Sequence, residues 1–305
     1  RLHSWPAPSQ TRGGADSIAC MKVYISVDME GISGLVRWPD VVTTGIDFER
    51  SRRFMTADAN AAIEGAFDAG ATEVVVEENH GIEDLCVLLM DEIDERCHVV
   101  RGAGRPTATT MAALDSDCAV VLLVGHHACA GSNPGIMAHT IYYGKFKTVR
   151  LAGQLVGESE LFAIRAGELG VPVGLVTGDQ VVAEQLRKRA PWVDAVVVKR
   201  ALSNVSGDLI PPARAREAIR AGASGALERL RAGELQPYRG EPAPYEFEVE
   251  LGEPICDDMR SNLETMEEFE IEGDRLVRIV AEDMDLGFRR VAYLGFANLP
   301  GVTRY

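Results

Sequence analysis

Residues Cys118–Val124 read CAVVLLV, and Gly125, His126 and His127 follow them directly. This nearly continuous apolar run has the length of a strand rather than of a helix. Strands of this kind lie in sheets that are covered on both faces, which is the arrangement of mainly parallel sheets. The run therefore predicts an α/β fold and places the two histidines at the end of a buried strand.

Strand and helix patterns alternate on both sides of this run. Residues 48–67, for example, place apolar side chains at helical spacing and are followed by Gly70, a typical residue after a helix end. The same reasoning predicts strands at Lys22–Val27, 73–76, His98–Val100, 173–177 and 195–198, a hairpin over 148–156, and helices at 84–94, 106–114, 159–169 and 183–189. Such an alternation is typical of an α/β domain with a mainly parallel sheet and flanking helices.

The composition changes after Pro211. We expect a long helix over 213–232, a turn-rich linker over 237–244, strands at Tyr245–Leu251 and 275–281, and a helix over 284–296. Residues 1–20 show no periodicity and lack the apolar core of a signal peptide, whereas a strand pattern opens at Met21. We therefore predict a flexible extension at 1–20 before a true start at Met21, an α/β domain at 21–210, and a smaller C-terminal α+β subdomain at 211–305.

The composition excludes several kinds of partner. The chain has 305 residues, 46% of them hydrophobic, which is ordinary for a globular protein. Its formal net charge of −15 repels phosphate backbones, so we expect no nucleic acid partner. No apolar run approaches the roughly 20 residues of a membrane span, so we expect no membrane partner. The six cysteines form no CxxC pair and are interpreted as reduced thiols of a cytoplasmic protein.

Acids and imidazoles follow three of the predicted strands. Asp28 and Glu30 come just after the first strand, His80 follows the second, and His126 and His127 follow the apolar run. In open α/β sheets the carboxyl ends of the strands form the edge where ligands bind. Two carboxylates and two imidazoles at one point suit a divalent metal, and the mixture of oxygen and nitrogen favours zinc.

Each of these residues also has a purely structural interpretation. One of the adjacent His126 and His127 is expected to be structural, because neighbours in a chain rarely share a target. Downstream, His139 and Glu158 are further candidates, although Glu158 near a helix start also complements the helix dipole. Asp179 is explained equally well as a helix N-cap. Of the other histidines, His3 and His98 are expected to lie outside the site.

Five short motifs resemble one known family. They are SVDMEGISG at 26–34, GHHA at 125–128, PGIMAH at 134–139, VGE at 156–158 and GD at 178–179. In the same order and at similar spacings, they resemble the DppA-type zinc-dependent D-aminopeptidases. The resemblance runs from Met21 to about Pro212 and weakens afterwards.

The resemblance implies a function and a site. It implies two zinc ions per chain held by Asp28, Glu30, His80, His127 and Glu158, with Asp28 as the bridge, and a catalytic role for His139. Residues 21–210 would then be the metal-binding catalytic domain. The substrates would be short peptides with an amino-terminal D-residue, of the D-Ala-D-Ala type, cleaved by a water that two metals activate and with His139 as proton shuttle. The family further implies a homo-oligomer of two stacked pentameric rings.

Two departures from the family pattern keep alternatives open. The family usually shows Asp-Ser-His where this chain has Glu78, Asn79 and His80, and Arg where Asn204 stands. Two interpretations of Glu78 stay open: its longer side chain still reaches and orients His80, or it is a solvated glutamate of a loop. A metal-dependent amidase or lactam hydrolase on the same scaffold is the first alternative function. A non-catalytic metal-binding or solute-binding protein is the second, and His139 argues against it.

Overall fold

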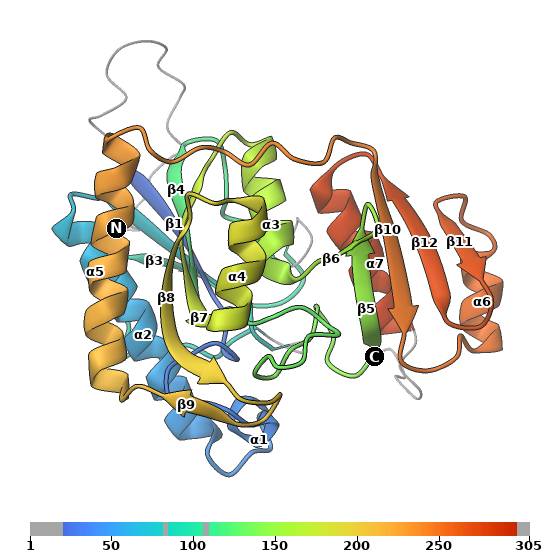
Figure 1. The fold of residues 1–305 in the computed structure, drawn as a ribbon, viewed down its shortest axis with the longest axis horizontal. Helices are drawn as coiled ribbons and strands as arrows, with labels where there is room; N and C mark the ends of the chain where they lie inside the picture. Colours follow the sequence, from blue (N-terminus) through green and yellow to red (C-terminus); the bar gives the residue numbers. More distant parts are fainter. Residues whose placement is uncertain (1–20, 82–84, 106–109, 298–305) are drawn as a thin grey trace, which may run out of the picture.

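The computed structural model of the chain describes residues 21–81, 85–105 and 110–297, and it contains two sheets (Figure 1). The first sheet has the strand order β3-β2-β1-β4-β7-β8-β9. Its strands are β1 (Lys22–Val27), β2 (Glu73–Glu78), β3 (His98–Val100), β4 (Cys118–Val124), β7 (Val173–Asp179), β8 (Asp194–Ala201) and β9 (Gly207–Leu209). All neighbours pair in parallel except β8 and β9, which are antiparallel.

The order of the strands reverses between β1 and β4. From β1 the chain adds β2 and β3 on one side, and it then returns to add β4, β7 and β8 on the other side. A crevice forms at such a switch point because the connections leave the two strands in opposite directions. The fold therefore places a ligand site at the carboxyl ends of β1 and β4.

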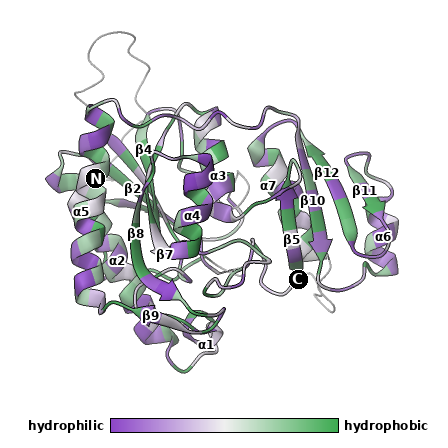
Figure 2. Ribbon diagram, in the orientation of Figure 1, coloured by the Kyte–Doolittle hydropathy of each residue, from purple (hydrophilic) through white to green (hydrophobic). Residues whose placement is uncertain are grey.

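Helices cover the first sheet on both faces. The helices that flank it are α2 (Phe48–Asp68), α3 (Glu158–Glu168), α4 (Gln180–Arg189) and α5 (Pro212–Arg231). The short helix α1 (Trp38–Val41) packs against α2. Side chains of β4 alternate between two cores: Val120 and Leu122 pack with α2 and α5, whereas Val121 and Leu123 face the core that contains α3. Strands such as β4 are accordingly apolar along most of their length. The helices α2 and α5 instead carry hydrophobic residues, drawn in green, and hydrophilic residues, drawn in purple (Figure 2).

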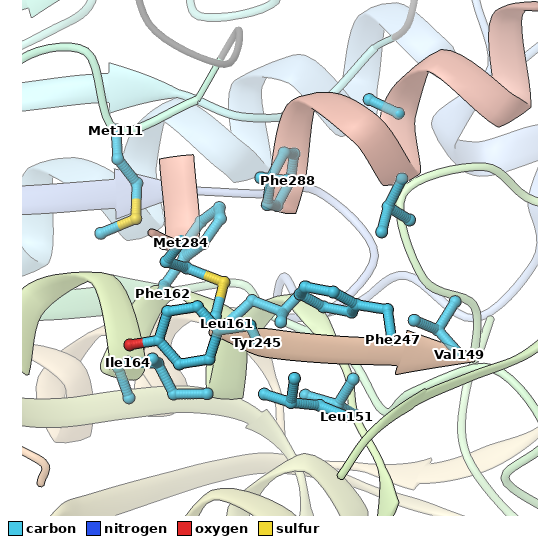
Figure 3. Packing of buried hydrophobic residues seen from close by; sticks show 14 of the residues in the cluster. Met111, Val149, Leu151, Leu161, Phe162, Ile164, Tyr245, Phe247, Met284 and Phe288 are labelled. Carbon is cyan, nitrogen blue, oxygen red and sulfur yellow. The ribbon is translucent and has the colours of Figure 1, made fainter. Parts of the chain in front are cut away.

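The second sheet is antiparallel and has the order β11-β12-β10-β5-β6. Its elements are β5 (Phe146–Leu151), β6 (Gln154–Leu155), β10 (Tyr245–Leu251), β11 (Phe269–Glu272) and β12 (Leu276–Ala281), with the helices α6 (Asp257–Leu263) and α7 (Met284–Ala297). Side chains from α3, α7 and the second sheet meet in one hydrophobic cluster, which Figure 3 shows around Phe162, Phe247 and Phe288.

The predicted fold class is confirmed, and so are the strands and the hairpin over 148–156, where β5 and β6 pair. The division of the chain at residue 211 stays a prediction about folding units. The sheets themselves draw on both sides of that point, because β5 and β6 join the second sheet and α5 packs against α2. No helix of the described residues has the length and apolar character that a membrane span requires.

Two predicted helices are wrong. Residues 85–94 form turns because their amides bond to side chains of other elements: Leu89 donates to the Thr56 hydroxyl and Asp94 to the Asn60 side chain. Residues 110–114 are also not helical, since the amides of residues 112 and 113 donate to the Glu77 carboxylate. The rest of that predicted helix, 106–109, and the predicted extension at 1–20 lie outside the described residues. The elements α1, α6, β9 and β11 were not predicted.

Candidate metal centre

Close backbone contacts join the carboxyl ends of β1 and β4. The Asp28 amide donates to the Val124 carbonyl (2.9 Å). The Gly31 amide donates to the Gly125 carbonyl (2.7 Å). A Cβ atom on Gly31 would overlap the carbonyl oxygen of His126, and Gly125 has a φ of +74°. Glycine is therefore required at both positions, and the turns after the two strands lie against each other at the switch point.

Two groups of acids and imidazoles gather at this point. The first consists of Asp28, Glu30 and His80, and the second of His127, His139 and Glu158. Within each group the potential ligand atoms lie within 4.8 Å of one another. No member is more than 9% exposed, so water does not compensate their charges as it would at the surface.

Asp28 lies between the two groups. Its Oδ1 atom is 3.4 Å from Nδ1 of His80, and its Oδ2 atom is 3.2 Å from Nε2 of His127. Within the first group, Nδ1 of His80 is 2.9 Å from Oε2 of Glu30. Within the second, Nε2 of His127 is 3.4 Å from Oε1 of Glu158. The structure thus brings together all five residues that the family resemblance implied as ligands.

The donor set fits a divalent cation of the zinc type. Among the described residues, Oδ2 of Asp28 and Nε2 of His127 are buried polar atoms that form no hydrogen bond of good geometry. A buried polar atom in that condition is costly unless a ligand satisfies it. Both atoms lie at the junction of the two groups, and carboxylate oxygen with imidazole nitrogen is a donor mixture that suits zinc.

The charges of the site are strongly coupled. Burial lowers the pKa of His80 and of His127, but the neighbouring carboxylates outweigh it and hold both pKa values well above the usual range. Burial would raise the pKa of Asp28, yet the nearby imidazoles of His127 and His80 lower it. The pKa of Glu158 is lowered to about 2 against the effect of burial, chiefly through His127. The three carboxylates outnumber the imidazoles of His80 and His127, and a cation bound between them would take the place of the imidazole protons.

His139, a member of the second group, faces one carboxylate of each group without close contact. Its Nε2 atom lies 3.9 Å from Oε1 of Glu30 and 4.0 Å from Oε1 of Glu158. Its Nδ1 atom is 3.0 Å from the carbonyl of Met137, which assigns the proton to Nδ1 and leaves the Nε2 lone pair facing the site. The ring stacks on His127 with centroids 3.9 Å apart. This geometry permits either proton transfer or coordination at Nε2.

Two paired residues of β7 and β8 hold the loops that carry the site. Lys199 donates from Nζ to the carbonyls of Glu30 (2.5 Å), Ile32 (2.9 Å) and Leu35 (2.7 Å). Its register partner Asp179 caps α4, as expected, and also accepts from the backbone amide of residue 136 (2.8 Å) in the loop before His139. Sequence reasoning missed Lys199, whose signal is a lysine directly after the apolar run AVVV at 195–198.

The remaining histidines lie outside both groups. His126 bonds through Nε2 to the Ser26 hydroxyl (2.9 Å) and packs edge-on against Phe162, so it is the structural member of the adjacent pair. His98 lies on β3, away from the site, whereas His3 falls outside the described residues.

The hypothesis that Glu78 supports His80 is wrong. Glu78 accepts from the amides of Val87 and Leu88, and it pairs with Arg101 at 3.2 Å. His80 instead uses Glu30 and the Val41 carbonyl, the latter at 2.8 Å from Nε2. The extra methylene of Glu78 therefore serves the turn after β2 and not His80.

Asn204 lies against the loop that carries His139. Its side-chain amide donates to the backbone carbonyls of Ser132 and Gly135, both at 2.9 Å. The backbone carbonyl of Asn204 accepts from the backbone amide of Met137. The second departure from the family pattern therefore falls on a residue that shapes this loop.

A buried cluster of acids and imidazoles at the switch point of an α/β sheet, with a further histidine beside it, is the construction of a metal-dependent enzyme. The chain belongs to the D-aminopeptidase family, Peptidase M55, whose family model matches residues 21–292. It is accordingly a hydrolase of the metallopeptidase class, and the family predicted from the five motifs is confirmed.

Relatives agree with this assignment. A D-aminopeptidase of Bacillus subtilis (strain 168) is 35% identical over 195 residues, which are 64% of this chain and 69% of the relative. A solved structure described as the Zn-dependent D-aminopeptidase DppA from Bacillus subtilis, a self-compartmentalizing protease, superimposes with a TM-score of 0.82 at 28% identity. The match covers 93% of this chain and 100% of that structure, so the second sheet belongs to the shared fold as well.

Proposed function

We propose that this chain binds two zinc ions and hydrolyses short peptides that begin with a D-amino acid, of the D-Ala-D-Ala type. The observation that carries the proposal is the position of Asp28, whose two carboxylate oxygens each lie beside an imidazole of a different group. Glu30 and His80 would complete one metal sphere, and His127 and Glu158 the other. The zinc dependence of the solved D-aminopeptidase supports this choice of metal.

The chain's own residues provide for proton transfer. Zinc, when bound, supplies a Lewis acid that polarises a carbonyl group and makes water a nucleophile at neutral pH. His139 takes a proton from the attacking water at Nε2, and the water oxygen bonds to the carbonyl carbon. The carbon–nitrogen bond then breaks while His139 returns the proton to the leaving nitrogen. The hydrogen bond from Nδ1 to the Met137 carbonyl holds the ring in the orientation that this transfer requires.

The proposal extends to assembly and location. The solved relative is described as self-compartmentalizing, which supports a homo-oligomer for this chain, and we propose two stacked pentameric rings in the cytoplasm.

One comparison of substrates tests the function. Zinc-loaded protein is incubated with D-Ala-D-Ala, L-Ala-L-Ala and a simple lactam, and amine release is followed. We expect release from D-Ala-D-Ala at the highest rate. Opening of the lactam alone would contradict the proposal and favour the amidase or lactam hydrolase.

Metal content is tested separately by elemental analysis of gently purified protein. We expect two zinc ions per chain, because five buried ligands exceed what one tetrahedral zinc takes. A content near one that added zinc does not raise would contradict the dinuclear site.

A further inference from the structure

An aromatic pair lies directly beside His139. The ring of Trp38, at the start of α1, meets the His139 ring edge-on, with centroids 5.5 Å apart and planes at 73°. Tyr143 stacks on Trp38 with centroids 3.5 Å apart and planes at 27°. Tyr143 is 56% exposed, so the pair offers aromatic surface to solvent next to the site.

Hydrogen bonds tie the short helix that carries Trp38 to the site and to its own preceding turn. The carbonyl of Val41, in the same short helix as Trp38, accepts from Nε2 of His80. Asp40 accepts from the amides of Val36 and Arg37, which closes the turn that leads into α1. Trp38 is therefore tied to the site through its helix, and Tyr143 is placed by stacking on Trp38.

The proposed chemistry decides which part of a peptide meets this surface. His139 returns a proton to the leaving nitrogen, and that nitrogen belongs to the second residue of the peptide. The second residue consequently lies on the His139 side of the scissile bond. Trp38 contacts His139, so the side chain of the second residue extends toward the aromatic pair.

We propose that Trp38 and Tyr143 form a wall that receives the side chain of the second residue and selects peptides in which that side chain is large and apolar or aromatic. The inference rests on the proposed function and names its substrate class more closely. Aromatic faces favour aromatic partners in offset or edge-on geometry and gain from removing apolar surface from water. A D-residue followed by phenylalanine or leucine is thus a better substrate than one followed by glycine or alanine.

The test uses the zinc-loaded full chain and the peptides D-Ala-Gly, D-Ala-D-Ala, D-Ala-D-Leu and D-Ala-D-Phe. We expect kcat/KM to rise along the series by roughly tenfold or more, the range that apolar pockets achieve. Tyr143→Ala and Trp38→Ala should lower the ratio between D-Ala-D-Phe and D-Ala-Gly toward one, mainly through KM. Tyr143→Phe keeps the ring and should keep the ratio. Met90→Ala is the matched control, because Met90 is 50% exposed and lies outside both metal groups.

Calorimetric binding of the same peptides separates this inference from the proposed function. If no peptide is cleaved, the proposed function fails. The wall is still supported in that case if D-Ala-D-Phe binds more tightly than D-Ala-Gly and Tyr143→Ala abolishes the difference. Equal kcat/KM values and equal affinities across the series in the wild type would overturn it. A ratio that Tyr143→Ala and Met90→Ala alter alike would overturn it too.

Discussion

Lys199 is a buried amine whose hydrogen bonds hold the turn that begins at Glu30. It lies in β8, far along the chain from that turn, and it bonds three of the turn's backbone carbonyls at once. A ligand that is held by its surroundings binds metal more tightly than one that must be ordered on binding. Lys199 is therefore a positioning residue for Glu30.

The substitution Lys199→Met should weaken zinc binding by roughly 10–100-fold, which is the usual size of effects from residues behind a ligand. Competition with a chelator measures the affinity, and a thermal melt of the same sample reports the fold. Lys188→Met, at an exposed position of α4, is the control. Unchanged affinity in Lys199→Met would show that the turn keeps its shape without the amine.

His139→Ala should abolish hydrolysis and leave the metal in place. A proton-transfer residue contributes about 10²–10⁴-fold to the rate, whereas its Nε2 atom lies 3.9 Å or more from the carboxylates of Glu30 and Glu158. Single-turnover kinetics and elemental analysis are made on the same preparation. Loss of zinc would instead make His139 a ligand of the second group.

At this scale the sequence predicted the polar residues that follow strands. Asp28, Glu30, His80 and His127 were found because strand ends meet at one edge, and the structure brings them together. Lys199 and the aromatic pair were missed because their partners are distant in the chain and follow no periodic pattern. Burial of a lysine is visible only once the strands have been placed.

Among the elements, the contact of α2 with α5 contains a buried carboxyl group. Asp58 of α2 accepts from the amide and hydroxyl of Ser33, each at 2.9 Å, and pairs with Arg216 of α5 at 3.2 Å. Burial nevertheless outweighs these bonds and raises the pKa of Asp58 to about 6. This carboxyl therefore ties the turn after β1 to both helices at an electrostatic cost.

That cost predicts a pH dependence of stability. Between about pH 4 and pH 6 the folded protein keeps a proton that the unfolded chain has released, so the Asp58 contribution to the free energy of unfolding falls as pH rises. A rise of the Asp58 pKa from its ordinary value of 3.8 to about 6 corresponds to roughly 3 kcal/mol in the free energy of unfolding. Urea unfolding at pH 4 to 7 should show this fall in the wild type relative to Asp58→Asn, in which the group does not titrate. A constant difference between the two proteins would contradict the raised pKa.

Strands were predicted better than the connections between them. The run at β4 and the pattern at β10 depend on local apolar spacing, which the sequence displays directly. The segments at 85–94 and 110–114 have helical spacing as well, but side chains of α2 and β2 bind their amides. Such long-range hydrogen bonds override local propensity and leave no local pattern.

For the molecule as a whole, several large apolar side chains are exposed. Ile46 is 95% exposed, Leu202 70% and Val205 52%. The segment that contains Leu202 and Val205 contacts the His139 loop, because Asn204 accepts from Met137. Exposed apolar side chains on the segment beside this loop mark a surface that other molecules cover, and further copies of the chain are the partner that the proposed rings require.

The assembly is tested by light scattering at micromolar concentration. Two stacked pentameric rings predict a mass of about 330 kDa, ten times the 33.0 kDa of one chain. Leu202→Asp places a charge on the exposed surface and should lower the mass, since burying an unpaired carboxylate in an interface is costly. Met90→Asp adds the same charge at a position 50% exposed on the turn after β2 and should keep the full mass.

A wild-type protein that scatters as a monomer would contradict the rings, and with them any exclusion of large substrates by an enclosed chamber. A full-size assembly of Leu202→Asp would keep the rings but place their contacts on another face of the molecule.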